Sequence, residues 1–150
     1  MVQWKVIMSE SSLRYFTLEE ANATLPYVRS IVTDVVAAYE EWKEHVAQYE
    51  VMAANSRSVE GETDAQVTLQ AEVERIAKLI GGYLSELETV GCTFKGLDDG
   101  LVDFLSVRDG RDVFLCWKLG EPEITHWHKL DAGFAGRQIL TPEFVGEESR

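Results

Sequence analysis

The motif His126-Trp-His128 holds the best-spaced pair of potential metal ligands in the 150-residue sequence. On a β-strand, residues two positions apart point to the same face and lie about 6.5–7 Å apart along the strand. Two imidazoles at that spacing can bind one divalent transition-metal ion, and a carboxylate could complete the ligand set. The candidate metal ligands are therefore His126, His128, Glu123 and Asp103, with Asp131 as a further carboxylate.

The direction in which these histidines point depends on the turns around them. Asp109-Gly110 predicts a tight two-residue hairpin, and a following loop from Leu119 to Pro122 would bring both histidines to the apolar face of the sheet. Imidazoles inside a hydrophobic shell suit a metal site or a general base. They suit two hydrogen-bonded structural histidines equally well, so all three interpretations stay open. By strand parity, Glu123 would lie on the opposite face unless the turn distorts the strand.

Gly133-Phe-Ala-Gly136-Arg137 is a candidate anion-binding segment. Glycines allow the backbone to approach an anion closely, and arginine offers a forked donor for phosphate or carboxylate. The simpler interpretation is a glycine turn whose Arg137 pairs with a surface carboxylate. The sequence has no GxGxxG or Walker-type motif, so a nucleotide site has little support.

Asp103 and Cys116 both stand within apolar, strand-like runs. Asp103 can join a metal site only if the strand register allows it, and pairing with Lys118 or Arg137 is the simpler interpretation. Cys116, in the run Val113-Phe-Leu-Cys-Trp117, is interpreted as a small buried hydrophobic residue. The sequence has no GxSxG elbow, no HExxH motif and no cysteine–histidine pair in a known context, so serine-nucleophile hydrolysis has no support.

The first element expected to support these strands is a long helix. Thr17-Leu-Glu-Glu20 forms a capping box that starts a helix at Leu18. Pro26 predicts a kink, followed by a new helix that Thr24 caps. An apolar seam with heptad spacing then continues for roughly 45 Å. Its members are Leu25, Val28, Val32, Val35, Tyr39, Trp42, Val46, Tyr49 and Ala53.

A second capping box, Thr63-x-x-Gln66, predicts another heptad helix after a loop at residues 55–61, and Gly91 suits its C-terminal end. Two such helices joined by a short loop fold into an antiparallel, coiled-coil-like hairpin. From Thr93 the apolar period changes towards two. Three strands are expected: Gly100–Leu105, Asp112–Lys118 and Glu123–Lys129. The predicted fold is therefore α+β, a long two-helix hairpin followed by a small three-stranded antiparallel β-meander.

Length and charge restrict the class of protein. We expect a flexible extension over residues 1–14, a single α+β domain over 15–140 and a loose acidic tail over 141–150, with Met8 as an alternative start to Met1. The formal net charge of −12 would repel nucleic acid and anionic membranes. No segment is apolar enough to span a membrane or serve as a signal peptide, and the two cysteines lack a CxxC spacing. These features predict a cytoplasmic protein with reduced cysteines.

The helical hairpin is also expected to be longer than its small sheet can cover. Apolar residues off the seam, namely Ile31, Val36, Leu79 and Leu84, would then need a second copy of the chain to cover them. We therefore predict a homodimer, with a further protein partner as an open alternative. The leading functional hypothesis is a non-enzymatic oligomeric interaction or regulatory module. The alternative is a metal- or anion-dependent enzyme or sensor with its site on the meander around His128.

Several blocks of this chain resemble a bacterial family known only as domain of unknown function 2203. The matching blocks, in order, are Tyr15-Phe-Thr-Leu-Glu-Glu-Ala-Asn22, Leu25-Pro26, Gly100-Leu-Val-Asp-Phe104, Arg108-Asp-Gly-Arg111, Leu115-Cys-Trp117, Trp127-His128 and Gly133-Phe-Ala-Gly-Arg137. The resemblance covers about Tyr15 to Leu140 and implies a small cytoplasmic bacterial protein, without an assigned activity. The family often has another aromatic or polar residue in place of His126, so the resemblance favours His128 as the more important histidine. Residues 1–12 depart from the pattern, as expected if translation starts at or near Met8.

Overall fold

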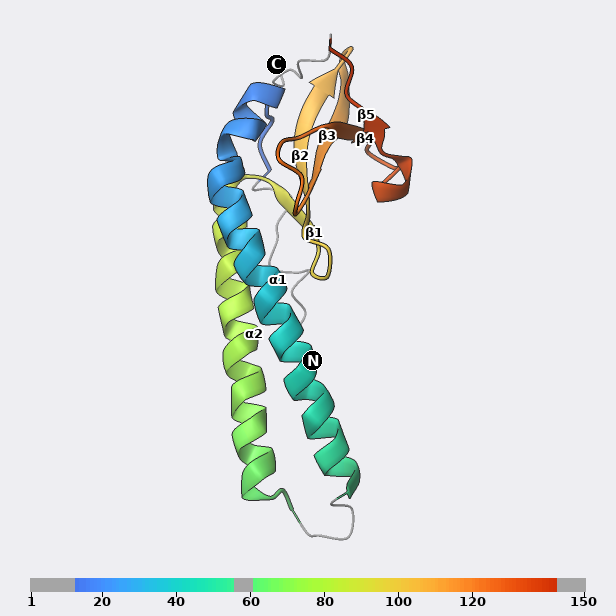
Figure 1. Cartoon of the computed structure of the whole chain (residues 1–150). Coiled ribbons are helices and arrows are strands. Elements are labelled where there is room, and N and C mark those ends of the chain that lie inside the picture. The colour runs from blue at the N-terminus through green and yellow to red at the C-terminus, as the bar shows by residue number, and fades with distance from the viewer. Residues whose placement is uncertain (1–12, 56–60, 143–150) are drawn as a thin grey trace.

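The computed structural model describes residues 13–55 and 61–142. In this part of the chain two helices precede a five-stranded antiparallel sheet, in which each strand pairs with the next one along the sequence (Figure 1). The helices are α1 (Leu18–Asn55) and α2 (Asp64–Val90), the strands are β1 (Thr93–Gly96), β2 (Leu101–Arg108), β3 (Arg111–Lys118), β4 (His126–Lys129) and β5 (Gln138–Ile139), and a short 3-10 turn η3 (Phe134–Gly136) precedes β5.

The α+β class and the helical hairpin are confirmed, whereas the prediction of three strands is wrong. The sheet gains β1 before the predicted meander and β5 after it. Both strands are short, with four and two residues, so neither carries the long alternating pattern from which strands are predicted. The expectations for residues 1–12, for most of the loop at 55–61 and for the tail beyond residue 142 fall outside the described residues.

Helix α1 begins where its capping box predicts. Thr17 Oγ1 accepts a hydrogen bond from the backbone N–H of Glu20 at 3.1 Å, and Glu20 Oε1 accepts one from the backbone N–H of Thr17 at 2.8 Å. The predicted second start at Thr24 is wrong, because α1 continues through Pro26 as one helix of 38 residues. The predicted kink at Pro26 stays a prediction. Leu25 and Val28, on either side of the proline, are both buried in the same core. Their packing keeps the two parts of the helix together although Pro26 removes one intrahelical hydrogen bond.

Helix α2 is capped at both ends as predicted. Thr63 and Gln66 form the capping box, and Gly91 ends the helix at φ 96°, with its N–H bonded to the carbonyl oxygens of Leu87 and Glu88. The two helices lie side by side and antiparallel, and the sheet covers only one end of the pair (Figure 1).

The chain just before α1 ties the helices to the sheet. The backbone N–H of Phe16 donates to the carbonyl oxygen of Leu105 at 2.7 Å, beyond the point where β1 stops pairing with β2. The N–H of Arg14 donates to the carbonyl oxygen of Gly91 at 3.3 Å. Phe16 is fully buried, and its ring meets Phe104 edge-on at 5.1 Å between centroids. This segment therefore fixes the start of α1 against the centre of the sheet.

The predicted two-residue turn sets the register of the central hairpin. Asp109 and Gly110 have φ values of 52° and 76°, and Arg108 pairs with Arg111 directly across the turn. Counting back from that pair aligns Phe104 with Leu115. The face that carries these two residues packs on the helices as part of one core, together with Val102, Val113, Trp117 and Trp127.

The prediction that His126 and His128 point to this apolar face is wrong. Strand β4 pairs Trp127 with Leu115, so Trp127 lies on the helix side and both histidines lie on the outer face. The loop before β4 runs to Thr125 and is longer than predicted. Within that loop the side chain of Ile124 is buried, and its backbone N–H donates to Asn22 Oδ1 of α1 at 2.9 Å. Ile124 is therefore held in the core before β4 begins at His126. The residues of β4 then alternate in the opposite sense to the prediction, with Trp127 towards the helices.

The off-seam apolar residues give less support to a dimer than the sequence suggests. Ile31 and Leu84 are buried within the chain, and Val36 packs against the core, whereas Leu79 is exposed. Within the described residues, neither helix combines the length and apolar character that crossing a membrane requires.

Gly100 provides a test of how tightly α1 packs on the sheet. It has φ 71°, and an added Cβ would lie 2.8 Å from Leu119 Cβ and Val32 Cγ1. We expect Gly100→Ala to lower the free energy of unfolding by about 2–4 kcal/mol, since backbone strain and overpacking add. Gly120→Ala is the matched control: its φ is 105°, but no atom lies within 4 Å of its added Cβ. In urea unfolding, the control substitution should lower the free energy of unfolding by only about 1–2 kcal/mol. An equal decrease in both variants would contradict tight packing around Gly100.

Candidate functional site

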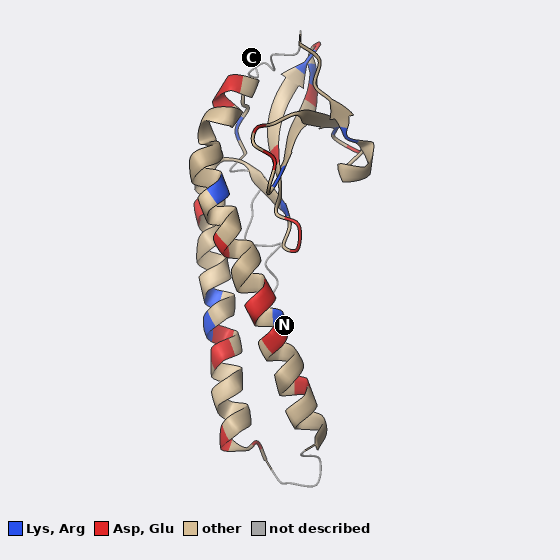
Figure 2. Cartoon of the chain, viewed as in Figure 1, with Lys and Arg blue, Asp and Glu red and all other residues tan. Residues whose placement is uncertain are grey.

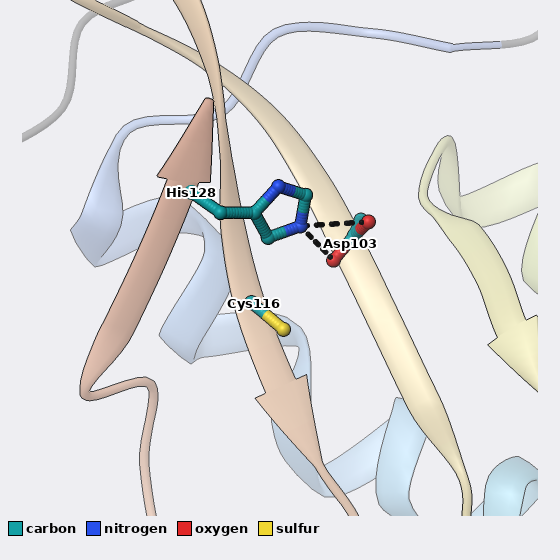
Figure 3. A group of neighbouring side chains, drawn as sticks. All are labelled: Asp103, Cys116 and His128. Carbon is teal, nitrogen blue, oxygen red and sulfur yellow. Dashed lines mark hydrogen bonds and ion pairs between the residues drawn. The ribbon is translucent and has the colours of Figure 1, made fainter. Parts of the chain in front are cut away.

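Three central strands bring Asp103, Cys116 and His128 together on the outer face of the sheet (Figure 3). Asp103 on β2 is aligned with Cys116 on β3, while His128 on β4 stands two residues further along the ladder on the same face, opposite Phe114. One carboxylate oxygen, the thiol sulfur and one imidazole nitrogen all lie within 4.8 Å of one another. All three side chains are buried, although they lie on the face away from the helices. We call these residues the trio.

Both ring nitrogens of His128 face hydrogen-bond acceptors. Nδ1 lies 2.8 Å from the backbone carbonyl oxygen of Lys129, and Nε2 lies 3.1 Å from each carboxylate oxygen of Asp103. A ring that carries a proton on each nitrogen donates to both acceptors. The hydrogen bond to Asp103 accordingly raises the pKa of His128, while burial and the charge of Lys95 oppose that rise. This buried contact with Asp103 therefore favours the imidazolium form of His128.

Cys116 is a protonated thiol in this arrangement. Burial raises the pKa of the Cys116 thiol to about 12, and the negative charge of Asp103 and a hydrogen bond to it act in the same direction. A cysteine nucleophile needs a lowered pKa and a base beside the sulfur. Here Asp103 binds both other members of the trio, and His128 directs its two nitrogens to Asp103 and to the backbone. The geometry does not fit nucleophilic catalysis by Cys116.

A pocket of about 280 Å³ opens beside the trio. Its other walls are mostly apolar and come from β1, β2, β3 and the segment between β4 and β5. The lining residues outside the trio are Lys95, Leu101, Phe114, Leu130, Gly133 and Phe134. The trio therefore has access to a small cavity with apolar walls.

The structure unites only part of the predicted metal-ligand set. It places Asp103 next to His128, but His126 lies outside the trio, with Nδ1 2.8 Å from Thr125 Oγ1 and 3.8 Å from Glu121 Oε2. Glu123 is exposed in the loop before β4, and Asp131 is exposed after β4. These two carboxylates do not reach the group that His128 forms.

The predicted anion-binding segment contacts a carboxylate of the chain itself. Arg137 Nη2 lies 2.9 and 2.8 Å from the two carboxylate oxygens of Glu121, and 3.4 Å from the carbonyl oxygen of Cys116. Gly133, at φ 64°, lines the pocket, and Gly136 lies in η3. A role for these residues in binding a separate anion stays a prediction.

Sequence reasoning missed Cys116 as a member of the site. The signal was present, because the two-residue turn at Asp109-Gly110 aligns Cys116 with Asp103 in the ladder. Both residues therefore had to share a face. His128 could not be placed in the same way, since the loop before β4 has no turn motif that sets its length.

Comparison with known proteins identifies a family but no function. The family described as Uncharacterized conserved protein (DUF2203) matches residues 14–140. No curated protein and no solved structure matches the chain.

The buried ion pair predicts a large effect on stability. We expect Asp103→Asn and His128→Gln each to lower the free energy of unfolding by about 3–5 kcal/mol in chelator-treated protein, because each leaves a buried partner uncompensated. The free energy of unfolding of the double variant should decrease by clearly less than the sum of the two single decreases, with a coupling energy of about 0.5–3 kcal/mol. His126→Gln is the control, since His126 is only partly buried, and should change stability little. Additive losses in a urea-unfolding double-mutant cycle would contradict the pairing.

Proposed function

The chain belongs to the DUF2203 family of uncharacterised conserved proteins, and we propose that it is a metal-binding protein that holds one divalent transition-metal ion between Asp103, Cys116 and His128. The observation that carries this proposal is the convergence of one oxygen, one sulfur and one nitrogen donor within 4.8 Å at a buried position beside a pocket. Family membership contributes no activity, so the proposal depends on the chemistry of the site.

The donor set favours zinc or a similar ion. Cysteine sulfur, histidine nitrogen and carboxylate oxygen are the ligands that zinc takes in proteins, and three protein ligands leave a fourth position open. Donor atoms around one zinc ion lie roughly 3.3–3.8 Å apart. Small side-chain rotations from the observed arrangement would reach those separations.

The second nitrogen of His128 also supports a metal site. A metal-binding histidine usually donates its other N–H to a backbone carbonyl or a carboxylate, which fixes the ring and its tautomer. The 2.8 Å contact between Nδ1 and the carbonyl oxygen of Lys129 has this form. It leaves Nε2 facing the carboxylate of Asp103, where a metal ion would take the place of the proton between them.

Charge balance favours the exchange of protons for a metal ion. If His128 is an imidazolium, Asp103 a carboxylate and Cys116 a neutral thiol, the trio without metal has a net charge of about zero. With a divalent ion it would hold a neutral imidazole, a carboxylate and a thiolate, again with a net charge of about zero, after the release of two protons. A buried site therefore gains no uncompensated charge when the ion enters.

The metal site is tested with cobalt as a spectroscopic substitute for zinc. We expect chelator-treated protein to take up one Co²⁺ per chain and to develop a thiolate-to-cobalt charge-transfer band together with visible bands of a tetrahedral site. Cys116→Ser should abolish the charge-transfer band, and Asp103→Asn should weaken binding by more than the roughly 10–100-fold typical of an outer-shell change.

Two variants control for the identity of the ligands. Cys92→Ser removes the other buried thiol, and His126→Gln removes the neighbouring imidazole. Both should retain one Co²⁺ and the charge-transfer band. Folded parent protein that binds no stoichiometric Co²⁺ or Zn²⁺ would reject the metal function, and loss of the band in Cys92→Ser would place the site elsewhere.

A second candidate function is an oligomeric interaction or regulatory module built on the helical hairpin. It is favoured by the half of the hairpin that lies away from the sheet (Figure 1). After Trp42 no side chain of α1 is buried in the described residues, and Val51 and Val67 are 59% and 53% exposed. A second copy of the chain, packed helix against helix, would cover this half.

The dimer is tested by light scattering at micromolar concentration. We expect the parent chain to have the mass of a dimer, and Val51→Glu combined with Val67→Glu to have the mass of a monomer, because charge would enter the apolar contact. Tyr27→Glu is the matched control, since Tyr27 is 54% exposed but lies at the sheet end of α1. A monomeric parent, or equal dissociation by the control, would reject this interface.

A further inference from the structure

The pocket beside the trio has a size and a wall chemistry that restrict the molecules it can hold. Its volume of about 280 Å³ lies just under the usual range of ligand pockets, roughly 300–1,000 Å³. Such a space suits a small organic molecule rather than a nucleotide. Leu101, Leu130 and two phenylalanines supply apolar walls, so part of that molecule should be apolar as well.

Lys95 gives the pocket a positive charge. It is the extra residue of a β-bulge, because Phe94 pairs with Val102 and Gly96 with Leu101, which leaves Lys95 between them unpaired in the ladder. A bulge of this kind changes the direction of a side chain next to a site. Lys95 Nζ lies 5.8 Å from the ring centroid of Phe114, and its charge acts on His128. Among residues 13–55 and 61–142, no carboxylate forms an ion pair with Lys95.

Two further cations stand around Phe134, on the wall formed by η3. Lys118 Nζ lies 5.5 Å from the ring centroid of Phe134, and Arg137 Cζ lies 4.8 Å from it. Arg137 is neutralised by Glu121, whereas Lys118 adds positive charge. The chain as a whole has a net charge of −12, so this local excess of cations is opposite in sign to the rest of the protein. An anion would be attracted here and repelled elsewhere.

We propose that the pocket binds a small organic monocarboxylate with an apolar or aromatic end. This ligand rests on the proposed metal function, because its carboxylate would occupy the open position on the metal ion and pair with Lys95. Its apolar end would lie between Phe114, Leu130 and Phe134. One negative charge on the ligand balances the charge of Lys95, which lines the pocket. Inorganic phosphate fits less well, because it carries more charge and has no apolar group for these walls.

The test uses the full chain loaded with Co²⁺ and compares four probes: phenylacetate, acetate, phenylacetamide and inorganic phosphate. We expect phenylacetate to shift the visible cobalt bands in a saturable way and to bind at least about tenfold more tightly than acetate, because its ring becomes buried. Phenylacetamide lacks the charge and should not compete. Phe134→Ala should bring the affinity of phenylacetate towards that of acetate.

Lys95→Gln tests the charge partner, with Lys78→Gln on the exposed face of α2 as the matched control. Lys95→Gln should weaken phenylacetate binding about three- to fivefold, in the range of an exposed ion pair, and leave the thiolate-to-cobalt band unchanged. An equal effect of both substitutions would overturn the role of Lys95. Cobalt bands that no carboxylate shifts, or that only phosphate shifts, would overturn this proposal and leave the metal site intact, whereas absence of the cobalt bands themselves would reject the metal site.

Discussion

The alternation of side chains across the β2–β3 hairpin is the constraint on which both the fold and the candidate site depend. One set of positions, including Phe104 and Leu115, packs on the helices and completes the core. The other set, including Asp103 and Cys116, is left for the outer face. Because the period of a strand is two, a slip of one residue would bury the aspartate against α1 and expose the core. The Asp109-Gly110 turn sets this register, and it therefore determines both which residues pack in the core and which residues form the trio.

The trio is costly to bury, and the structure reduces that cost by local pairing. A carboxylate and an imidazolium lose hydration when they enter a protein interior, and only close contact with good hydrogen bonds compensates for this. His128 makes such contacts on both sides of its ring. Burial on an outer face also differs from burial in the core, because the pocket keeps a route to solvent. Other charged residues are distributed along both helices (Figure 2).

The sequence predicted the elements with strong local signals and failed where long-range packing decides. Two capping boxes, a heptad seam and the Asp-Gly turn defined both helices and the central hairpin, because each signal lies within a few residues of the structure it produces. The continuity of α1 through Pro26 depends on core packing that no local pattern contains. The orientation of β4 depends on the contact between Ile124 and Asn22, which are far apart in the sequence. For the same reason the site could be located on the meander, and Asp103 and His128 named, while their partner Cys116 and the correct face were missed.

The edges of the sheet have a consequence for the solution behaviour of the chain. Strand β5 has two residues, and β1 has four residues interrupted by a bulge. Beyond the end of β1, the backbone N–H of Phe16 donates a hydrogen bond to the carbonyl oxygen of Leu105 on β2. Long, regular edges act as templates for strand addition and aggregation, and short or bulged ones do not. The short and bulged edges of the meander therefore offer little template for edge-to-edge pairing with another sheet.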